Sequence, residues 1–187
     1  MTKGAGAGGR SPDVAVRLAQ PGDWPAVAGL LVELGRGVAE GTADDPTHQL
    51  QFAGHVRQIE HVTLVAEEVA ADQASDPRPA ALLGVIDMEY HQRLGDHRPQ
   101  ARVSDLVVTG AARGRGVGRA LLSRAEELAS KRGCFRMALV TASWRDGTIA
   151  FYEREGWHDY GRWFVKPLTS AIGPGGEPTL DDTLGGD

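Results

Sequence analysis

The sequence predicts an α/β fold built on a mixed β-sheet, on three observations. Segments of alternating or clustered apolar residues, typical of strands, are interleaved with segments whose apolar residues recur every three or four positions, typical of helices. Several strand-like segments follow one another in the middle of the chain. A strand, a glycine-rich turn, a helix and another strand occupy residues 101–141, which is the order of a parallel crossover. Helices packed on a mixed sheet are therefore expected.

The length of 187 residues fits one domain with a tail at each end. We expect the folded domain at residues 13–169. Residues 1–12 are rich in Gly and Ala, and residues 170–187 are rich in Gly, Pro and acidic residues. Such segments bury too little apolar surface to offset the entropy of ordering, so both are predicted to be flexible tails.

The overall charge and composition exclude several classes of protein. A formal net charge of −5 does not favour binding to nucleic acid. The single cysteine, Cys134, cannot form a disulfide within the chain. The sequence shows neither a signal-peptide pattern nor an apolar run of the roughly 20 residues that cross a bilayer, so we expect a cytoplasmic protein without a membrane partner.

The first half of the domain is predicted to contain three strands and two helices. The strands lie at residues 14–18, 61–69 and 81–90. The first helix has an apolar face formed by Trp24, Val27, Leu30, Leu31 and Leu34. The second helix starts near Asp44-Asp45-Pro46 and has a weaker apolar stripe of Leu50, Phe52, Val56 and Ile59.

The second half is predicted to alternate strands and helices. The strands lie at residues 101–109, 135–141 and 160–165, and the helices at residues 117–132 and 146–155. Gly133 and Gly156 follow the two helices, at the position where glycine commonly ends a helix.

The turn before the helix at 117–132 has the composition of an anion-binding site. It reads Arg113, Gly114, Arg115, Gly116, Val117, Gly118 and Arg119. The first N–H groups of a helix lack intrahelical partners and lie at its positive end, so they attract anions. Glycines let a phosphate approach the backbone, and arginine side chains match phosphate oxygens.

The turn motif alone is compatible with other functions. An ordinary flexible glycine turn remains open on this motif alone. A Walker-type nucleotide loop is disfavoured because no Gly-Lys-Ser/Thr ends the turn, and a dinucleotide-binding turn would normally lie in an early strand–helix–strand unit.

Two motifs together resemble a known family. Arg113-x-x-Gly116-x-Gly118 is similar to the Gln/Arg-x-x-Gly-x-Gly/Ala signature of the GNAT superfamily of N-acetyltransferases, and the stretch from Phe151 to Trp157 resembles its Phe-Tyr-Glu-x-x-Gly-Phe helix ending. The specific resemblance covers about residues 103–157. The first half of the chain matches only in the order of its elements.

The resemblance implies the acyl-CoA N-acyltransferase fold, which has a mostly antiparallel sheet and one parallel strand pair that splays at the cofactor site. It implies that acetyl-CoA lies with its pyrophosphate on residues 113–119 and its pantetheine arm beside Val107 and Val108. The slot for this arm would lie between residues 106–108 and 139–141. An N–H group near Val108 would help to polarise the thioester carbonyl.

The resemblance also implies direct transfer of the acetyl group to a primary amine. Tyr152 matches the tyrosine that gives a proton to the CoA sulfur. Asp105 is the first candidate for the proton acceptor, and a water molecule can replace a single base. Asp87 and Glu89 alternate on one face of the earlier strand and could instead bind a cationic substrate, and Glu67 and Glu68 are further options. Arg145 and Thr148 depart from the family pattern and leave the polar contacts at that end of the helix open.

The sequence does not identify the amine, which could be a polyamine, an amino acid, an aminoglycoside-like molecule or a protein. A non-catalytic acyl-CoA-binding regulatory module is the alternative function. The edge strand at residues 160–165 suggests a possible homodimer. No metal is expected, because the six histidines show no metal-ligand spacing, and His55 and His61 are too far apart for adjacent turns of one helix.

Overall fold

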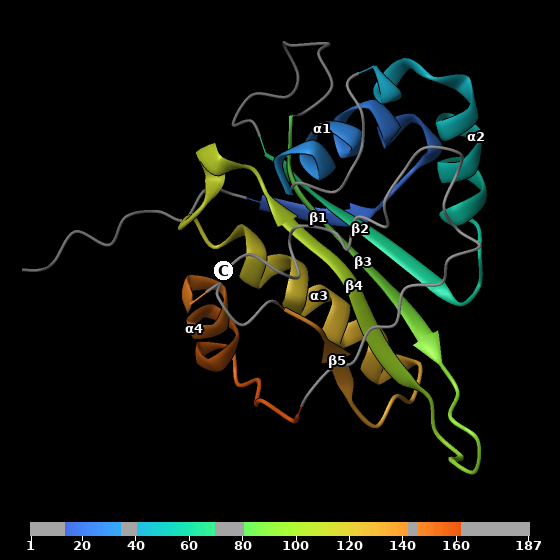
Figure 1. Ribbon diagram of the computed structural model, residues 1–187, viewed down its shortest axis with the longest axis vertical. Coiled ribbons are helices and arrows are strands. Elements are labelled where there is room, and N and C mark those ends of the chain that lie inside the picture. The colour runs from blue at the N-terminus through green and yellow to red at the C-terminus, as the bar shows by residue number, and fades with distance from the viewer. Residues whose placement is uncertain (1–13, 35–40, 70–80, 142–145, 162–187) are drawn as a thin grey trace, which may run out of the picture.

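The computed structural model describes residues 14–34, 41–69, 81–141 and 146–161, which form a five-stranded sheet with helices on both faces (Figure 1). The strands are β1 (Val14–Leu18), β2 (His61–Glu68), β3 (Leu82–His91), β4 (Gln100–Val108) and β5 (Met137–Leu139). The α-helices are α1 (Trp24–Leu34), α2 (Pro46–His55), α3 (Val117–Lys131) and α4 (Asp146–Arg154). Short 3₁₀ helices are η1 (Pro21–Asp23), η2 (Thr42–Asp44) and η3 (Gly110–Ala112).

The strands lie in the sheet in their chain order. Pairing from β1 to β4 is antiparallel throughout, and only β4 and β5 run parallel. Helix α3 connects these two parallel strands and packs on one face of the sheet against β1, β2, β3 and β4, as a crossover connection requires. The prediction of a mixed, mostly antiparallel sheet with one parallel pair is confirmed.

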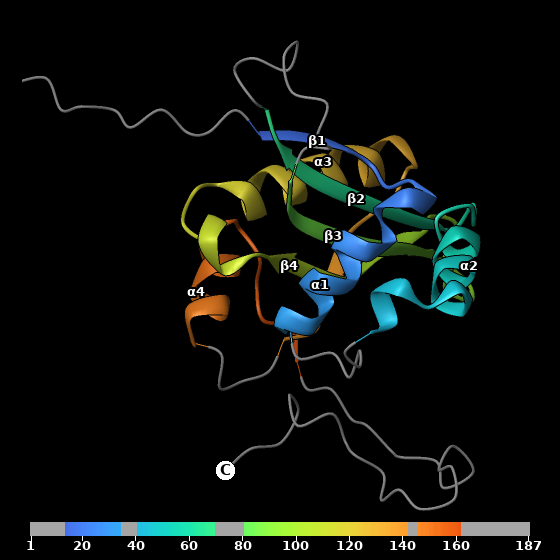
Figure 2. The ribbon, with the colours of Figure 1, turned by 90° about the horizontal axis from the view of Figure 1, so that it is seen from above.

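Alternating side chains along the strands supply one apolar core on each face of the sheet. Figure 2 shows α1 and α2 on one face and α3 on the other. The core beneath α1 and α2 includes Trp24, Val27, Leu30, Phe52, Val65, Val85 and Val107. The core beneath α3 includes Leu64, Ile86, Met88, Val103, Val117, Leu121 and Ala125. Asp87 is an exception to this pattern, because it places a carboxylate on the α1–α2 face of the sheet.

The apolar stripe predicted for α2 was wrong in part. The helix starts as expected, with Asp45 accepting a hydrogen bond from the Thr47 N–H at 2.8 Å. It ends at His55, however, so Ile59 falls in the following turn and is 78% exposed. Leu50 is 74% exposed, and Phe52 is the residue of the stripe that is fully buried. This short helix at the edge of the core therefore buries fewer apolar side chains than its sequence periodicity suggests.

The other predicted elements agree with the structure to within a few residues. Gly133 and Gly156 both have φ in the left-handed region, at 82° and 84°, and end their helices as predicted. The predicted tails at 1–12 and 170–187 lie outside the described residues. So do residues 162–165 of the predicted last strand, and Tyr160 and Gly161 are not in a strand. Arg145 is also outside the described part of the chain. Within that part, none of the helices combines the length and apolarity needed to cross a membrane.

Candidate functional site

The two parallel strands separate partway along β4. Their pairing runs from Ala101 opposite Met137 to Val103 opposite Leu139 and stops there. Strand β4 nevertheless continues to Val108. Residues 104–108 therefore present a backbone edge that β5 does not cover. The slot expected between residues 106–108 and 139–141 would start here, since pairing with β5 among the described residues ends at Val103 and Leu139.

A β-bulge marks the point where the strands begin to separate. Asp87 of β3 pairs with Asp105 of β4, whereas the next residue, Met88, pairs with Val103. Ser104 is thus the extra residue in β4. A bulge bends its strand and changes the direction of the backbone groups beside it, and bulges are common next to active sites.

Strand β4 leads into the glycine turn through a contact from α1. The Glu33 carboxylate accepts hydrogen bonds from the Thr109 hydroxyl at 2.9 Å and from the Gly110 N–H at 3.0 Å. The Gly110 bond is the main reason why the pKa of Glu33 lies below its usual value, and the Thr109 bond adds to it. Glu33 thereby fixes the start of the turn. This role could not be predicted from the sequence, because Glu33 is far from the turn along the chain and only the apolar face of its helix has a periodic pattern.

The N-terminus of α3 has the geometry of an anion site. Gly116 is the N-cap residue with φ of 84°, in the left-handed region that L-residues with a side chain rarely adopt. No side chain caps this helix end, so the N–H groups of Val117, Gly118 and Arg119 have no capping partner within the described residues. A methyl group built on Gly114 or Gly116 would meet nothing within 4 Å, so the turn is open to a ligand.

Glycine is needed at position 118 for a different reason than at positions 114 and 116. A Cβ atom at this position would lie 3.3 Å from the Phe151 ring of α4 and 3.7 Å from Cγ2 of Val108. The missing side chain therefore lets the first turn of α3 pack against α4 and the end of β4. This adds a packing role to the amide access that the sequence pattern suggested for Gly118.

The three arginines of the turn each have an internal partner. Arg119 forms a bidentate ion pair with Glu155, with Nε–Oε2 and Nη2–Oε1 distances of 2.9 and 2.7 Å. Arg115 Nη2 lies 2.6 Å from Glu68 Oε1, and Arg113 Nε donates to the Val108 carbonyl at 3.3 Å. Hydrogen bonding to Arg119 lowers the pKa of Glu155. Much of the basic charge at the turn is therefore balanced by carboxylates, which leaves the helix N-terminus as a major attraction for an anion.

Val107 and Val108 face opposite sides of the sheet. Val107 is 3% exposed and packs beneath α1, and Val108 packs toward α3. Both side chains belong to the protein interior. A ligand in the splay would accordingly meet the backbone of these residues.

Tyr152 lies on α4, which is close to the N-terminus of α3 (Figure 1). Its ring is half-buried and packs between Phe151 and Trp157, with centroid distances of 5.3 and 5.8 Å. The Gly118–Phe151 contact and the Arg119–Glu155 pair hold α4 against the same end of α3. The two motifs identified in the sequence thus meet in space.

The acidic candidates fall into two groups. Asp105, Asp87 and Glu89 lie on the face of the sheet that α1 and α2 cover, with Asp105 directly opposite Asp87 in the register. Of these, Glu89 pairs with Arg102 at 2.5 Å. Glu67 is bound by Arg17 at 2.9 Å, and Glu68 by Arg115. Both lie on β2 and hold structural ion pairs, whereas Asp105 and Asp87 lie beside the bulge of β4.

A hollow of about 390 Å³ lies at the opposite end of α3. Its lining includes Tyr90, Pro99 and Arg132, which lie at the end of β3, before β4 and after α3. Arg132 stacks on the Tyr90 ring at 5.2 Å and pairs with Glu60 at 3.0 Å. Because this hollow is at the far end of β4 from the glycine turn, it is not part of the candidate site.

Comparison with protein families identifies the architecture. The sequence model described as the Acetyltransferase (GNAT) family matches residues 45–157, which is more than half of the chain. The chain belongs to the GNAT family. The match includes β4, the glycine turn, α3 and α4, so the family signature coincides with the splayed strands and the open helix N-terminus.

Curated relatives of this GNAT protein include glucosamine 6-phosphate N-acetyltransferase 1 from Oryza sativa subsp. japonica. It is 34% identical over 80 residues, which cover 43% of this chain and 44% of the relative. A probable glucosamine 6-phosphate N-acetyltransferase 2 from the same plant is 35% identical over 80 residues. The matched region thus spans less than half of each relative.

Solved structures show the same fold at lower sequence identity. A putative acetyltransferase from Agrobacterium tumefaciens has a TM-score of 0.69 and 24% identity, covering 82% of this chain and 99% of its own. AAC(6′)-Iy in complex with a bisubstrate analogue, CoA-S-monomethyl-acetylneamine, has a TM-score of 0.66 and 17% identity, covering 83% and 97% of the two chains. These likenesses establish the GNAT fold.

Proposed function

We propose that this GNAT protein transfers the acetyl group of acetyl-CoA to a primary amine. The proposal is based on three structural features that follow one another along the chain. Strand β4 leaves β5 after Val103, a bulge lies at Ser104, and the strand then leads into a helix whose N-terminus has no side-chain cap. This path offers backbone groups to an extended arm and the N–H groups of a helix N-terminus to a diphosphate.

The residues of the turn fit acetyl-CoA in their chemistry. The N–H groups of residues 117–119 would hold the diphosphate, and Arg113, Arg115 and Arg119 would surround it with positive charge. The backbone of Val107 and Val108 would bind the pantetheine arm. Their side chains are engaged in the two cores, so this recognition is proposed to depend on main-chain atoms.

In the proposed reaction the amine nitrogen bonds to the acetyl carbon, the carbon–sulfur bond breaks, the nitrogen loses a proton and the sulfur gains one. We assign Tyr152 as the proton donor to sulfur. Asp105 is the proposed proton acceptor, either directly or through a water molecule. A backbone N–H near Val108 would stabilise negative charge on the acetyl oxygen.

The acceptor is proposed to approach from the face covered by α1 and α2. Asp105 and Asp87 give this face negative charge, which attracts a protonated amine. The names of the rice relatives and of AAC(6′)-Iy point to amino sugars as acceptors of those proteins. Amino sugars are therefore the first acceptor class to test, followed by polyamines, amino acids and peptides.

The test is a transfer assay with the full chain. Acetyl-CoA would be mixed separately with glucosamine 6-phosphate, glucosamine, an aminoglycoside, a polyamine, an amino acid and a peptide. We expect acceptor-dependent release of CoA thiol and an acetylated product by mass spectrometry. Comparison of the first two acceptors shows whether the sugar phosphate contributes. Tight binding of acetyl-CoA without acetylation of any acceptor would contradict the proposal and favour an acyl-CoA-binding regulatory module.

A further inference from the structure

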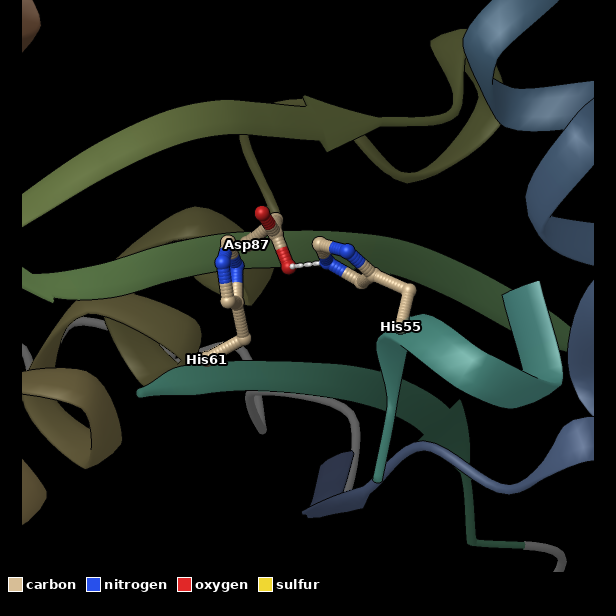
Figure 3. A group of neighbouring side chains, drawn as sticks. All are labelled: His55, His61 and Asp87. Atoms are coloured by element: carbon tan, nitrogen blue, oxygen red, sulfur yellow. Dashed lines mark hydrogen bonds and ion pairs between the residues drawn. The ribbon is translucent and has the colours of Figure 1, made fainter. Parts of the chain in front are cut away.

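Three potential metal ligands converge on the α1–α2 face of the sheet. They are His55 at the end of α2, His61 at the start of β2 and Asp87 in β3 (Figure 3). One ligand atom from each lies within 4.8 Å of the other two. The cluster is separate from the glycine turn, because Asp87 pairs with Asp105 within β4 and the turn follows the end of that strand.

The turn between α2 and β2 brings the two histidines together. Backbone hydrogen bonds from Gln58 N–H to the His55 carbonyl at 3.0 Å and from His61 N–H to the Gln58 carbonyl at 3.3 Å fold the intervening residues tightly. The ring centroids of His55 and His61 are 4.5 Å apart, with an angle of 61° between the planes. A six-residue separation does not place two side chains together within one helix, but it does so here because the helix ends between them.

Asp87 is oriented toward this cluster by two donors. Its Oδ1 atom lies 2.8 Å from His55 Nε2 and accepts a hydrogen bond from the Thr63 hydroxyl at 2.7 Å. Thr63 is buried and lies directly opposite Asp87 in the sheet. Such an outer hydrogen bond to a ligating carboxylate is typical of metal sites.

His61 contributes a second and independent observation. Its Nδ1 atom is buried and has no hydrogen-bond partner within the described residues. A buried polar atom without a partner is unfavourable by about 1–3 kcal/mol. Among the described residues, one ring nitrogen of His61 therefore lacks the hydrogen bond that it could form.

We propose that His55, His61 and Asp87 bind one divalent transition-metal ion, with Zn²⁺ as the best match. Two imidazoles and one carboxylate are a ligand set that Zn²⁺ uses, whereas Mg²⁺ and Ca²⁺ prefer oxygen ligands throughout. Three protein ligands leave a position open for water or a substrate group. The proposal departs from the expectation of no metal, which treated the two histidines as members of one helix.

Binding requires a small rearrangement of the side chains. Ligand atoms at about 2.1 Å from an ion are roughly 3.4 Å apart in tetrahedral geometry. The His55–Asp87 contact of 2.8 Å must therefore lengthen, and the widest separation in the cluster, up to 4.8 Å, must shorten. The His55 side chain is 32% exposed and lies at the end of the helix, so a rotation of the side chain can make this change. Its Nε2 atom loses any proton when it binds the ion.

The test measures metal binding directly and needs no turnover. The full chain, freed of metal with a chelator, would be titrated with Zn²⁺ by calorimetry and with Co²⁺ by absorption spectroscopy. We expect one ion per chain and visible Co²⁺ bands of low-symmetry coordination. His61→Ala and Asp87→Asn should each weaken Zn²⁺ binding at least about tenfold, and Thr63→Val should weaken it by about the same factor through the carboxylate.

A matched control is His48→Ala. His48 also lies beside an aspartate, with its Nδ1 atom 3.2 Å from Asp45 Oδ2, but it lies outside the cluster. This variant should keep wild-type affinity, as should Cys134→Ser. Circular dichroism would verify that each variant is folded, and His61→Gln replaces His61→Ala if the latter is not. Failure of the wild-type chain to bind Zn²⁺, or unchanged affinity in a folded His61 variant, would overturn the proposal.

Discussion

Two proposed catalytic side chains, Tyr152 and Asp105, come from different layers of the molecule. Tyr152 belongs to α4, where Phe151 and Trp157 hold its ring. Asp105 belongs to the sheet, next to the extra residue of the β-bulge. Separate positions suit the proposed reaction, because one residue accepts a proton from the amine and the other gives a proton to the sulfur. Neither residue has to do both.

Replacement of Tyr152 by phenylalanine tests the proton donor. The ring packing is kept and only the hydroxyl is removed, so we expect kcat to fall about 100-fold or more while KM for acetyl-CoA stays nearly constant. Steady-state kinetics with the best acceptor measures both parameters. Tyr160→Phe is the matched control, because Tyr160 is 91% exposed. A kcat for Tyr152→Phe within about twofold of wild type would remove Tyr152 from the mechanism.

At the scale of elements, the site depends on how β4 passes into α3. Glu33 of α1 fixes the start of the turn, Gly116 makes the left-handed step into the helix, and Gly118 allows α4 to pack against it. Three helices thus converge on one short segment. The conformation of the turn, and not its arginine charge alone, should control acetyl-CoA affinity.

Gly116→Ala tests this dependence on conformation. A Cβ atom at φ of 84° is strained, so the variant should lose about 1–2 kcal/mol of unfolding free energy or shift the turn, and acetyl-CoA affinity should fall. Calorimetry and thermal unfolding measure the two effects. Gly54→Ala, at an exposed helical position with open space around it, should instead raise stability by about 0.5–1 kcal/mol and leave affinity unchanged. Equal behaviour of the two variants would contradict the account.

Arg17 attaches the first strand to the 3₁₀ helix η1 and to the neighbouring strand β2. Arg17 binds Asp23 at 2.7 Å and Glu67 at 2.9 Å, which joins β1, η1 and β2. Hydrogen bonding to Arg17 is the largest cause of the lowered pKa of Asp23, and partial burial opposes it. Because the folded-state pKa is depressed, Asp23 stabilises the fold above its unfolded pKa and loses this contribution as the pH falls through the folded value.

Asp23→Asn should accordingly be destabilising at neutral pH and much less so in acid. We expect a loss of about 1–3 kcal/mol at pH 7, from denaturant unfolding, and a difference from wild type that narrows below about pH 4. Asp96→Asn, in an exposed loop, is the control and should change little at either pH. A stability difference for Asp23→Asn that is independent of pH would show that the charge of Asp23 is not responsible.

At the scale of the whole molecule, most of the fold followed from periodic sequence patterns. The order of strands and helices, the parallel pair and the helix-ending glycines were all anticipated, because each leaves a local signature. The exposed Leu50 and Ile59 were not, since burial depends on what covers a helix. Glu33, Glu155 and the His55–His61–Asp87 cluster were also missed as contacts, because they join segments far apart in the chain or on different elements.

The two faces of the sheet divide the proposed work. The glycine turn and α3 are proposed to bind the acyl donor, and the face beneath α1 and α2 carries the acidic residues, the histidine cluster and the proposed path of the acceptor. Strand β4 contributes to both through its bulge. Acetyl-CoA binding and acceptor or metal binding can therefore be altered separately by mutation.

The most direct test of the central claim is calorimetric titration of the full chain with acetyl-CoA, with ATP and NAD as controls. The account predicts one acetyl-CoA site of micromolar affinity that weakens in Gly116→Ala, and no comparable binding of either nucleotide. Absence of acetyl-CoA binding, or equal affinity for ATP, would show that the splayed strands and the open N-terminus of α3 do not form an acyl-CoA site.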